Sequence, residues 1–375
     1  MSGPTGSLVQ AAVIGLGFIG LAHVEALRRL GIPIAGVLGH GEDSTRRSAA
    51  ALGLRPYTGL DELLADPEVS VVHSCGPNAV HAEQNLRSLV AGRHVFSEKP
   101  LGTSVQECER QLQVAGQLGR QHGVNFSYRG YAAVQAMREV VRSSELGEVK
   151  YLRGHYLQDW LLLPGDYNWR VTAAAPETRA VADIGSHLAD LARFVTGLAP
   201  ERLYAQFSTL HPERLRPEGA ALSFGQSSGP GVPVAVCTED QASLLAHYPG
   251  GVRASFEVSQ VAAGHKNDLQ LEVLGTHGSV TWRQERPEEL LLGSREARRV
   301  IRLKDTAHPF THYPGGHPEG YPDAITNVIR AYYSALAGTP APYPTFEDGL
   351  AAAQFTEAAY RSSVSGEWTA LAAPS

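Results

Sequence analysis

Two short segments hold side chains suited to acid–base chemistry on a hydroxyl group. Glu98-Lys99-Pro100 follows an apolar run, and Asp183 and His187 are four residues apart, so they share one face if that segment is helical. A histidine exchanges protons near neutral pH, and a lysine ammonium can stabilise an alkoxide. These types suit oxidation of an alcohol, in which a base takes the hydroxyl proton while hydride leaves the carbon. An ordinary surface lysine and a helix-face histidine bonded to a carboxylate are the alternatives.

Such a hydride transfer needs a site for a dinucleotide, and Gly15–Gly20 is a candidate. The segment reads Gly-Leu-Gly-Phe-Ile-Gly and fits the G-x-G-x-x-G pattern between a predicted strand and a helix. The first glycine permits a tight turn, the second lets the backbone approach a pyrophosphate, and the third allows close helix–strand packing. Phe18 and Ile19 begin the helix, whose N-terminal N–H groups favour phosphate. A plain strand–helix turn with incidental glycines is the alternative.

The choice between NAD and NADP depends on the residues after the second predicted strand. An acidic residue there would bond the ribose hydroxyls of NAD. The sequence instead has Gly39-His40-Gly41, and Glu42 comes slightly late. His40 and Arg46 could contact the 2′-phosphate of NADP, or Arg46 could simply coat a surface helix. The cofactor is therefore predicted as NAD(P), with a weak preference for NADP.

Composition and charge restrict the class of protein. The chain has 375 residues, of which 43% are hydrophobic and 19% charged, and its formal net charge is −6. This balance argues against a protein that binds nucleic acid through a basic surface, and no apolar run is long enough to span a membrane. The three cysteines are not spaced as a disulfide framework or a zinc site, which favours a reducing compartment. A cytoplasmic protein is predicted.

Residues 1–126 predict the domain that would position the dinucleotide. Short apolar runs alternate with helical segments, which is the pattern of a doubly wound parallel sheet. The predicted strands are 10–14, 34–38, 69–74, 94–97 and 123–126. An N-terminal α/β Rossmann domain is therefore predicted, with Lys99 at the carboxyl edge of the sheet, where ligands bind in such folds.

Residues 127–375 predict a C-terminal α+β domain. Consecutive β-like runs are joined by turn residues, which favours a mostly antiparallel open sheet. These runs are 149–158, 203–207, 241–248, 252–260, 269–275 and 278–283. Helices are predicted at 183–196, 323–337 and 348–363. Residues 211–233, rich in Pro, Gly and Ser, are predicted to form an exposed loop.

Taken in order and spacing, the motifs resemble those of the glucose–fructose oxidoreductase / inositol dehydrogenase / MocA family. The segments that carry the resemblance are Gly15–Gly20, Pro77-Asn78 with His81, Glu98-Lys99-Pro100, Asp183–His187, Gly320-Tyr321 and Pro344–Gly349. The resemblance covers nearly the whole chain. It implies homodimers or homotetramers that pack through the open face of the C-terminal sheet.

The resemblance also implies roles for individual residues. Lys99, Asp183 and His187 correspond to the three catalytic positions, and Asn78 to a position near the nicotinamide. Hydride would pass between the nicotinamide and a carbon bearing a secondary alcohol on a sugar, an inositol or a related polyol. Together with the glycine loop and the turn after the second predicted strand, the predicted cofactor-binding set is Gly15, Gly17, Phe18, Ile19, Gly20, His40, Arg46, Pro77, Asn78, His81, Glu98 and Lys99. The acidic residue common after strand two in NAD-using members is absent.

Aromatic and polar residues in three further segments are candidates for substrate contact. They are Tyr128 and Arg129 after the last Rossmann strand, Trp169 and Arg170 before the Asp183 segment, and His317 and Tyr321 in a Gly/Pro-rich loop. Such side chains suit sugars, and oligomer contact is the equal alternative for the Trp169 loop. Metal-binding histidines need converging geometry and carboxylate or cysteine companions. The prolines and glycines between the histidines at 308, 312 and 317 give no regular face, so no metal site is predicted.

Several functions use these residues. A polyol or sugar dehydrogenase is the leading hypothesis, and a keto-sugar or dicarbonyl reductase would use the same residues with His187 as the acid. A non-catalytic dinucleotide sensor is disfavoured because Lys99, Asp183 and His187 are all present. An enzyme that recycles a tightly held cofactor between two substrates is the fourth possibility. The predicted partner is a small-molecule substrate, with no nucleic acid and no membrane.

Overall fold

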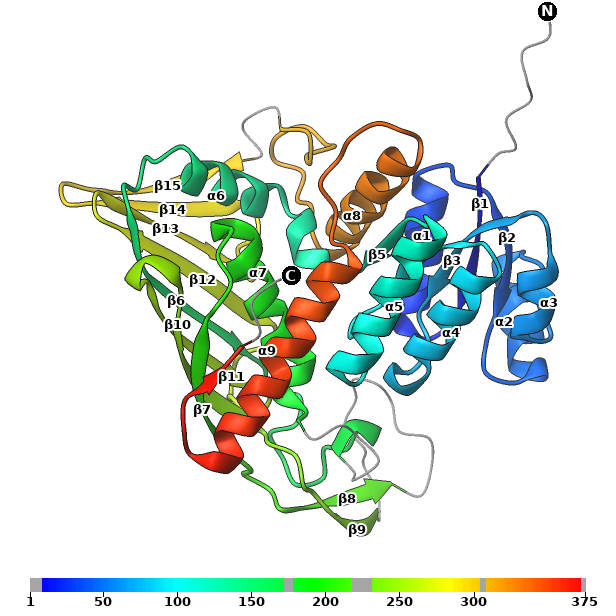
Figure 1. Cartoon of the computed structure of the whole chain (residues 1–375), viewed down its shortest axis with the longest axis horizontal. Helices are drawn as coiled ribbons and strands as arrows, with labels where there is room; N and C mark the ends of the chain where they lie inside the picture. The colour runs from blue at the N-terminus through cyan, green and yellow to red at the C-terminus, as the bar shows by residue number, and fades with distance from the viewer. Residues whose placement is uncertain (1–8, 172–177, 218–230, 304–307, 372–375) are drawn as a thin grey trace, which may run out of the picture. The chain divides into compact units, whose positions relative to one another are not determined.

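The computed structural model describes residues 9–171, 178–217, 231–303 and 308–371. The chain forms two compact units, one made of residues 1–130 and 321–350 and the other of residues 131–320 and 351–375 (Figure 1). The sequence analysis places all of 127–375 in the second domain, whereas in the structure residues 321–350 group with the first unit.

A parallel sheet of five strands forms the centre of the first unit, in the order β2-β1-β3-β4-β5. The strands are β1 (Gln10–Ile14), β2 (Ile34–Leu38), β3 (Val69–Ser74), β4 (His94–Ser97) and β5 (His122–Val124). This confirms the predicted doubly wound sheet. The chain runs from β1 outward to β2 and then returns to β3 on the other side of β1, so the order reverses there. Loops that follow β1 and β3 meet at this point, where such folds bind ligands.

Helices cover both faces of this sheet. They are α1 (Phe18–Arg29), α2 (Glu42–Leu52), α3 (Leu60–Ala65), α4 (Asn78–Val90), α5 (Val105–Leu118) and the late helix α8 (Tyr321–Leu336). Side chains alternate along β1, so Val13 packs with α1 and α8 while Ile14 packs with α3 on the opposite face.

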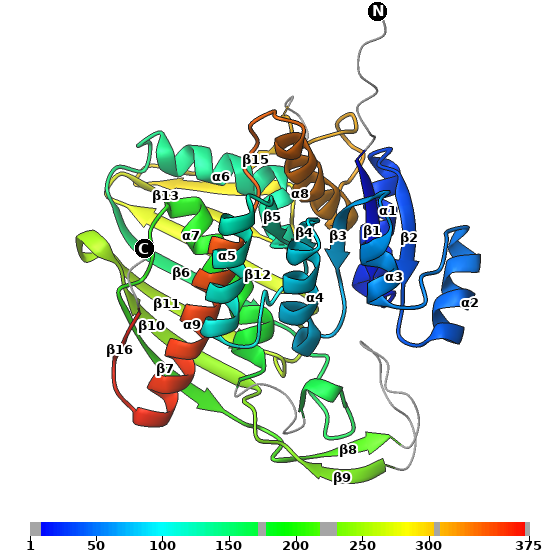
Figure 2. The ribbon, with the colours of Figure 1, turned by 45° about the vertical axis from the view of Figure 1, so that its right-hand side comes forward.

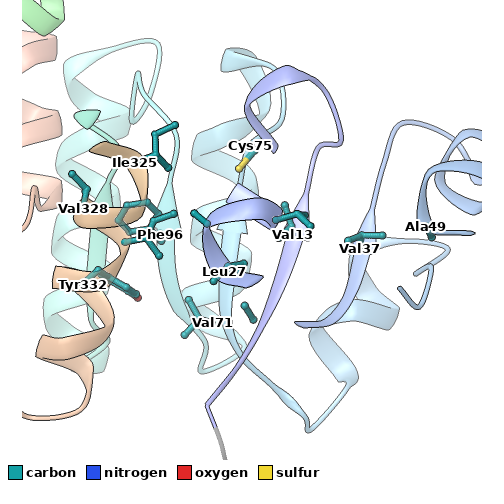
Figure 3. Packing of buried hydrophobic residues seen from close by; sticks show 14 residues of the cluster. Val13, Leu27, Val37, Ala49, Val71, Cys75, Phe96, Ile325, Val328 and Tyr332 are labelled. Carbon is teal, nitrogen blue, oxygen red and sulfur yellow. The ribbon is translucent and has the colours of Figure 1, made fainter. Parts of the chain in front are cut away.

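Helix α8 completes one face of the core of the first unit although it comes late in the chain. Ile325, Val328 and Tyr332 are buried against Phe96 of β4 (Figure 3). Each such side chain contributes about 1.5–3 kcal/mol when it is removed from water. The first unit therefore depends on residues that lie nearly 200 positions beyond its last strand, since β5 ends at Val124 and α8 begins at Tyr321.

A nine-stranded sheet forms the second unit, in the order β15-β14-β13-β12-β6-β11-β10-β7-β16 (Figure 2). The pair β6–β11 is parallel and the other neighbours are antiparallel, which confirms the predicted mostly antiparallel sheet. The strands are β6 (Val149–Leu157), β7 (Arg202–Ser208), β10 (Gln241–His247), β11 (Arg253–Ser259), β12 (Asp268–Gly275), β13 (Gly278–Arg283), β14 (Glu289–Ser294), β15 (Arg298–Arg302) and β16 (Thr369–Ala370).

The described helices of this unit pack on one face of the sheet and leave the other uncovered. They are α6 (Ala132–Arg142), α7 (Ser186–Thr196) and the part of α9 (Phe346–Ser365) that belongs to this unit (Figures 1 and 2). The alternation in β10 agrees, because Leu244 is buried and Leu245 is exposed. Gly154 in β6 lets α7 approach closely, since a Cβ there would lie 2.7 Å from Leu188 Cδ1.

The prediction of an exposed loop over residues 211–233 is wrong at both of its ends. Strands β8 (Glu213–Pro217) and β9 (Gly231–Ala235) pair antiparallel, and residues 218–230 lie outside the described part of the chain. Arg214 is fully buried although it lies in this segment, because its guanidinium donates to the backbone oxygens of Leu161, Leu163 and Asp166. Within the described residues, no helix is long and apolar enough to cross a bilayer.

Candidate active site

The glycine loop between β1 and α1 has two glycines that packing requires and one that it does not. Gly15 has a φ of +86°, and a side chain there would clash with the carbonyl of Cys75. A side chain at Gly20 would clash with the carbonyl of Gly15. At Gly17, a Cβ would meet nothing within 4 Å. The protein itself therefore leaves Gly17 open, as close approach of a ligand to the backbone requires.

The N-cap residue of α1 supplies no side-chain cap to the start of the helix. Its N-cap is Gly17, which has no side chain to satisfy the first N–H groups, and the first turn has no acidic residue. These N–H groups and the helix dipole favour a phosphate. The residues therefore fit a dinucleotide pyrophosphate. The helix begins at Phe18, which is 59% exposed and stacks on Tyr321 of α8 at 6.2 Å between ring centroids. The half-buried Ile19 follows it.

The turn after β2 holds the residues predicted to meet the adenosine end of the cofactor. The buried Thr45 fixes this turn, since its hydroxyl accepts from Gly39 N and donates to Gly41 O. His40 and Arg46 are exposed. Arg46 forms an ion pair with Glu42, one turn earlier in α2, so its guanidinium already has a carboxylate partner.

The loop after β3 is tied to the lysine segment through His81. His81 is buried, and its two ring nitrogens lie 2.7 Å from Gly76 O and 2.8 Å from Pro100 O. Burial lowers the pKa of His81. This side chain therefore joins two loops at the carboxyl edge of the sheet. Beyond the exposed Pro77, the half-buried Asn78 begins α4.

Glu98 is buried directly before Lys99 and anchors the lysine segment. Its Oε1 accepts from Asn125 over 2.6 Å and lies 3.1 Å from His23 Nε2, and its Oε2 accepts from the backbone N–H of Lys99 over 3.0 Å. Burial alone would raise the pKa of Glu98, but the bonds from His23 and Asn125 outweigh it and hold the pKa below its usual value. An ionised carboxylate thus fixes the backbone of the half-buried Lys99.

A line of hydrogen bonds continues from Glu98 through two buried histidines. His23 Nδ1 lies 2.9 Å from His73 Nδ1, and His73 Nε2 lies 3.0 Å from the Tyr333 hydroxyl. Burial lowers the pKa of His73 well below its usual value. If Tyr333 donates to His73, His73 to His23 and His23 to Glu98, each of these bonds has one donor and one acceptor. We call Glu98, His23, His73 and Tyr333 the histidine line.

Asp183 and His187 lie at the start of one continuous helical segment in the second unit. Asp183 is part of the π-helix Val181–Gly185, and His187 is the second residue of α7. Single π turns inside α-helices occur often at functional sites. Asp183 is half-buried, and His187 is 8% exposed, with its ring centroid 6.3 Å from that of Tyr156.

The beginning of this helical segment is held by a carboxylate from another part of the chain. Glu239 accepts from the backbone N–H groups of Arg179 over 2.9 Å and of Val181 over 2.8 Å. Thr178 Oγ1 accepts from Ala182 N over 3.1 Å. These oxygens satisfy N–H groups that a helix start leaves unpaired. Burial raises the pKa of Glu239 despite these bonds.

A fully buried ion cluster lies next to that cap. Arg179 and Arg214 both donate to Oδ1 of Asp240, and all three side chains are inaccessible to water. Burial raises the pKa of Asp240, but Arg179 outweighs it and the net pKa is lowered. Since Arg214 also holds the backbone of residues 161–166, one carboxylate joins the Asp183 helix to the loop that leads to Arg170. We call Arg179, Arg214 and Asp240 the arginine cluster.

The structure places the predicted substrate residues in different settings. Tyr128 is buried, and Arg129 is buried in an ion pair with Asp348, 2.9 Å from it. Arg170 is half-buried and donates its backbone N–H to Asn168 Oδ1. His317 is exposed, with Nδ1 3.1 Å from Pro314 O. Trp169 begins a 3₁₀ turn, and its side chain lies outside the described residues.

Several residues that support the site were missed by the sequence analysis. His23 and His73 interrupt the apolar face of α1 and the apolar run of β3, and such polar interruptions in buried elements are a usable signal. Glu239, Asp240 and Gln260 carry no local signal, because they contact the Asp183 helix only through the fold. Gln260 Nε2 donates to Asp183 Oδ2 over 2.9 Å. No cluster of three or more candidate metal ligands is present among the described residues.

Both parts of the chain match family models. Residues 9–126 match the model described as the oxidoreductase family, NAD-binding Rossmann fold. Residues 134–281 match the model described as the GFO/IDH/MocA C-terminal domain. The two matches lie on the elements that carry Lys99 and Asp183, respectively.

Individual proteins resemble the chain over its full extent. A levoglucosan dehydrogenase of Pseudarthrobacter phenanthrenivorans is 29% identical over 384 aligned residues, which cover 96% of this chain and 97% of that protein. The crystal structure of an oxidoreductase domain protein from Kribbella flavida has a TM-score of 0.90 and 29% identity, covering 98% of this chain and 100% of that one. A levoglucosan dehydrogenase in complex with NADH and levoglucosan has a TM-score of 0.87 and 25% identity, covering 97% and 100%.

Proposed function

Because the chain belongs to the glucose–fructose oxidoreductase / inositol dehydrogenase / MocA family of NAD-binding oxidoreductases, we propose that it interconverts a secondary alcohol and the corresponding ketone on a sugar, an inositol or a related polyol. The observation that carries the proposal is the support given to Lys99 and to Asp183. Glu98 accepts from the backbone N–H of Lys99, and Glu239 accepts from the backbone N–H groups of Arg179 and Val181, just before Asp183. The likeness to levoglucosan dehydrogenase supports an anhydro sugar as one candidate substrate.

The proposed roles follow from the chemistry of the three side chains. The nicotinamide, when bound, accepts or supplies the hydride. His187 takes the hydroxyl proton during oxidation and returns it during reduction, since imidazole exchanges protons near neutral pH. The ammonium of Lys99 stabilises the developing alkoxide. Asp183, four residues before His187, accepts a hydrogen bond from the substrate and balances the charge of the protonated histidine.

The residues that we propose for substrate contact are Tyr128, Trp169, Arg170, His317 and Tyr321. Arg129 is better explained as a structural residue, because its guanidinium pairs with Asp348 next to the start of α9 and both side chains are largely buried. A neutral polyol requires only donors and acceptors around its hydroxyl groups, and the polar and aromatic character of the remaining residues suits that need.

The choice between NAD and NADP depends on the turn after β2. The sequence favours NADP there, through His40 and Arg46, and this remains our proposal. The Glu42–Arg46 ion pair competes for the guanidinium that a 2′-phosphate would need, so the preference is expected to be small.

The three cysteines are free thiols, which supports the proposed cytoplasmic location. The open sheet face of the second unit, which the described helices leave uncovered, supports a homodimer or homotetramer.

The experiment that tests the function combines cofactor titration with two substitutions. NADH and NADPH binding is followed by nicotinamide fluorescence, and turnover is measured on sugars, anhydro sugars and inositols. We expect Lys99→Ala and His187→Ala each to lower kcat by about 10²- to 10⁴-fold while the Kd for the preferred cofactor stays the same. Lys150→Ala and His277→Ala, at exposed positions, are the matched controls. Loss of cofactor binding in both active-site variants would indicate structural roles and contradict the proposal.

A further inference from the structure

The side chain of Gln260 contacts Asp183 from the end of a neighbouring strand. Gln260 follows β11 directly, and its amide donates to Asp183 Oδ2 over 2.9 Å. Its side chain has no accessible surface. The π-helix that carries Asp183 packs on the end of β11, since Gly185 lies against Val258. The contact is therefore made between two buried, well-packed elements.

The backbone of Gln260 is held on both sides. Its N–H donates to Asp240 O over 2.9 Å, and its carbonyl accepts from Leu161 N over 3.1 Å. Asp240 belongs to the arginine cluster, and Leu161 begins the loop that Arg214 holds. Gln260 thus has little freedom to move, and a rigid donor can impose a position on the carboxylate that it contacts.

One oxygen atom of Gln260 distinguishes it from a side chain that serves packing alone. Its Oε1 is buried and has no hydrogen-bond partner among the described residues, and an unsatisfied buried acceptor destabilises the folded state. Gln111 provides the contrast, since it is equally buried. Its Nε2 donates to Leu101 O and Glu107 O, and its Oε1 accepts from Asn85. A leucine at position 260 would fill a similar volume without an unpaired oxygen.

From these observations we propose that Gln260 is a positioning residue for Asp183, an inference that rests on the proposed function. The amide N–H fixes which way the carboxylate faces, and it donates at every pH because an amide does not titrate. A donor at this point also favours the ionised form of the carboxylate. Glu239 holds the backbone of the same helical segment, so the backbone and the side chain of the Asp183 segment are held from the same end of the sheet.

The test compares Gln260→Leu with Gln111→Leu in the full-length protein. For Gln260→Leu we expect kcat to fall about 10- to 100-fold, because a bond to a charged group is lost. The melting temperature should fall less than in Gln111→Leu, because the substitution removes the unpaired Oε1 together with the bond, and the Kd for the preferred cofactor should not change. For Gln111→Leu we expect the melting temperature to fall while kcat changes little. A melting temperature that falls in Gln260→Leu as it does in Gln111→Leu, or an unchanged kcat, would overturn the proposal.

A double-mutant cycle with Asp183→Asn separates this inference from the proposed function. If Gln260 acts through Asp183, adding Gln260→Leu to Asp183→Asn lowers the residual kcat no further. Equal losses in both backgrounds would show that the two residues act independently and would overturn the inference. If Asp183→Asn alone is fully active, the proposed role of Asp183 fails. In that case the same cycle is measured in melting temperature. Coupled changes in the single and double variants support the positioning contact, and additive changes overturn it.

Discussion

The histidine line in the first unit and the arginine cluster in the second support the two proposed catalytic segments by different physical means. In the histidine line, a buried carboxylate is stabilised by hydrogen bonds from His23, Asn125 and a backbone N–H. In the arginine cluster, a buried carboxylate is shared by two guanidinium groups. One network is built from imidazole rings, and the other from guanidinium groups that stay charged across the physiological range.

Because of this difference, the two networks lose different amounts of stability when one of their residues is substituted. An ion cluster closed off from water loses a great deal when one member is removed, because the remaining charges are left uncompensated. A line of hydrogen bonds between imidazole rings loses one bond at a time, and burial of His73 makes the stability of the fold depend on pH. Three substitutions test this contrast.

The largest effect is expected in the arginine cluster. Asp240→Asn keeps the shape of the side chain but leaves Arg179 and Arg214 buried without their carboxylate. We expect the free energy of unfolding to fall by about 3–5 kcal/mol, measured by urea denaturation. The control is Asp61→Asn, at an exposed carboxylate that pairs with Arg87, where a change of about 0–1 kcal/mol is expected. Similar losses in both variants would remove the contrast between buried and exposed pairs.

A pH-dependent effect is expected at His73. Burial depresses the pKa of His73 in the folded state below its ordinary value of 6.5, so only the unfolded chain takes up a proton as pH falls below that value. Stability is therefore lost as pH falls from about 6.5 toward the depressed folded pKa. In His73→Phe this slope should decrease by up to about 1.4 kcal/mol per pH unit. Urea denaturation between pH 5 and 7 measures it, and an unchanged slope would show that His73 takes up a proton in the folded protein.

The smallest effect is expected at the outer end of the histidine line. Tyr333→Phe removes one neutral hydrogen bond to His73 and should lower the free energy of unfolding by about 0.5–1.5 kcal/mol. The pH slope of stability should remain as in the wild type, because His73 is still present and buried. A slope that changes with this substitution would mean that the hydroxyl, and not burial, keeps His73 neutral.

Local patterns predicted the elements on which the site is built, but not the contacts that hold it. The strands around Gly15–Gly20 and Lys99 follow from apolar runs, and the helix of Asp183 and His187 from its periodicity. The partner of Glu98 is 75 residues away in His23, and the partner of Asp183 is 77 residues away in Gln260. Pairing over such distances depends on strand order, which no single stretch of sequence contains.

The errors in prediction also have physical causes. Arg214 lies in a Pro- and Gly-rich segment that predicts an exposed loop, yet it is fully buried because backbone carbonyls and Asp240 satisfy its guanidinium. The predicted strand 123–126 ends at Val124, since Phe126 N turns back to bond Val124 O. The helix predicted from Asp183 begins earlier, at Val181, because Glu239 and Thr178 cap it.

The late return of α8 to the first unit has a consequence for how the protein is made. All five strands of the parallel sheet have been synthesised when residue 130 is complete, but the face that includes Phe96 stays uncovered until α8 is made. At 5–20 residues per second, synthesis from residue 130 to residue 321 takes about 10 to 40 s. During that interval the nascent sheet exposes apolar surface, a condition in which chaperones commonly bind. The second unit is completed later still, because α9 and β16 follow α8 in the chain.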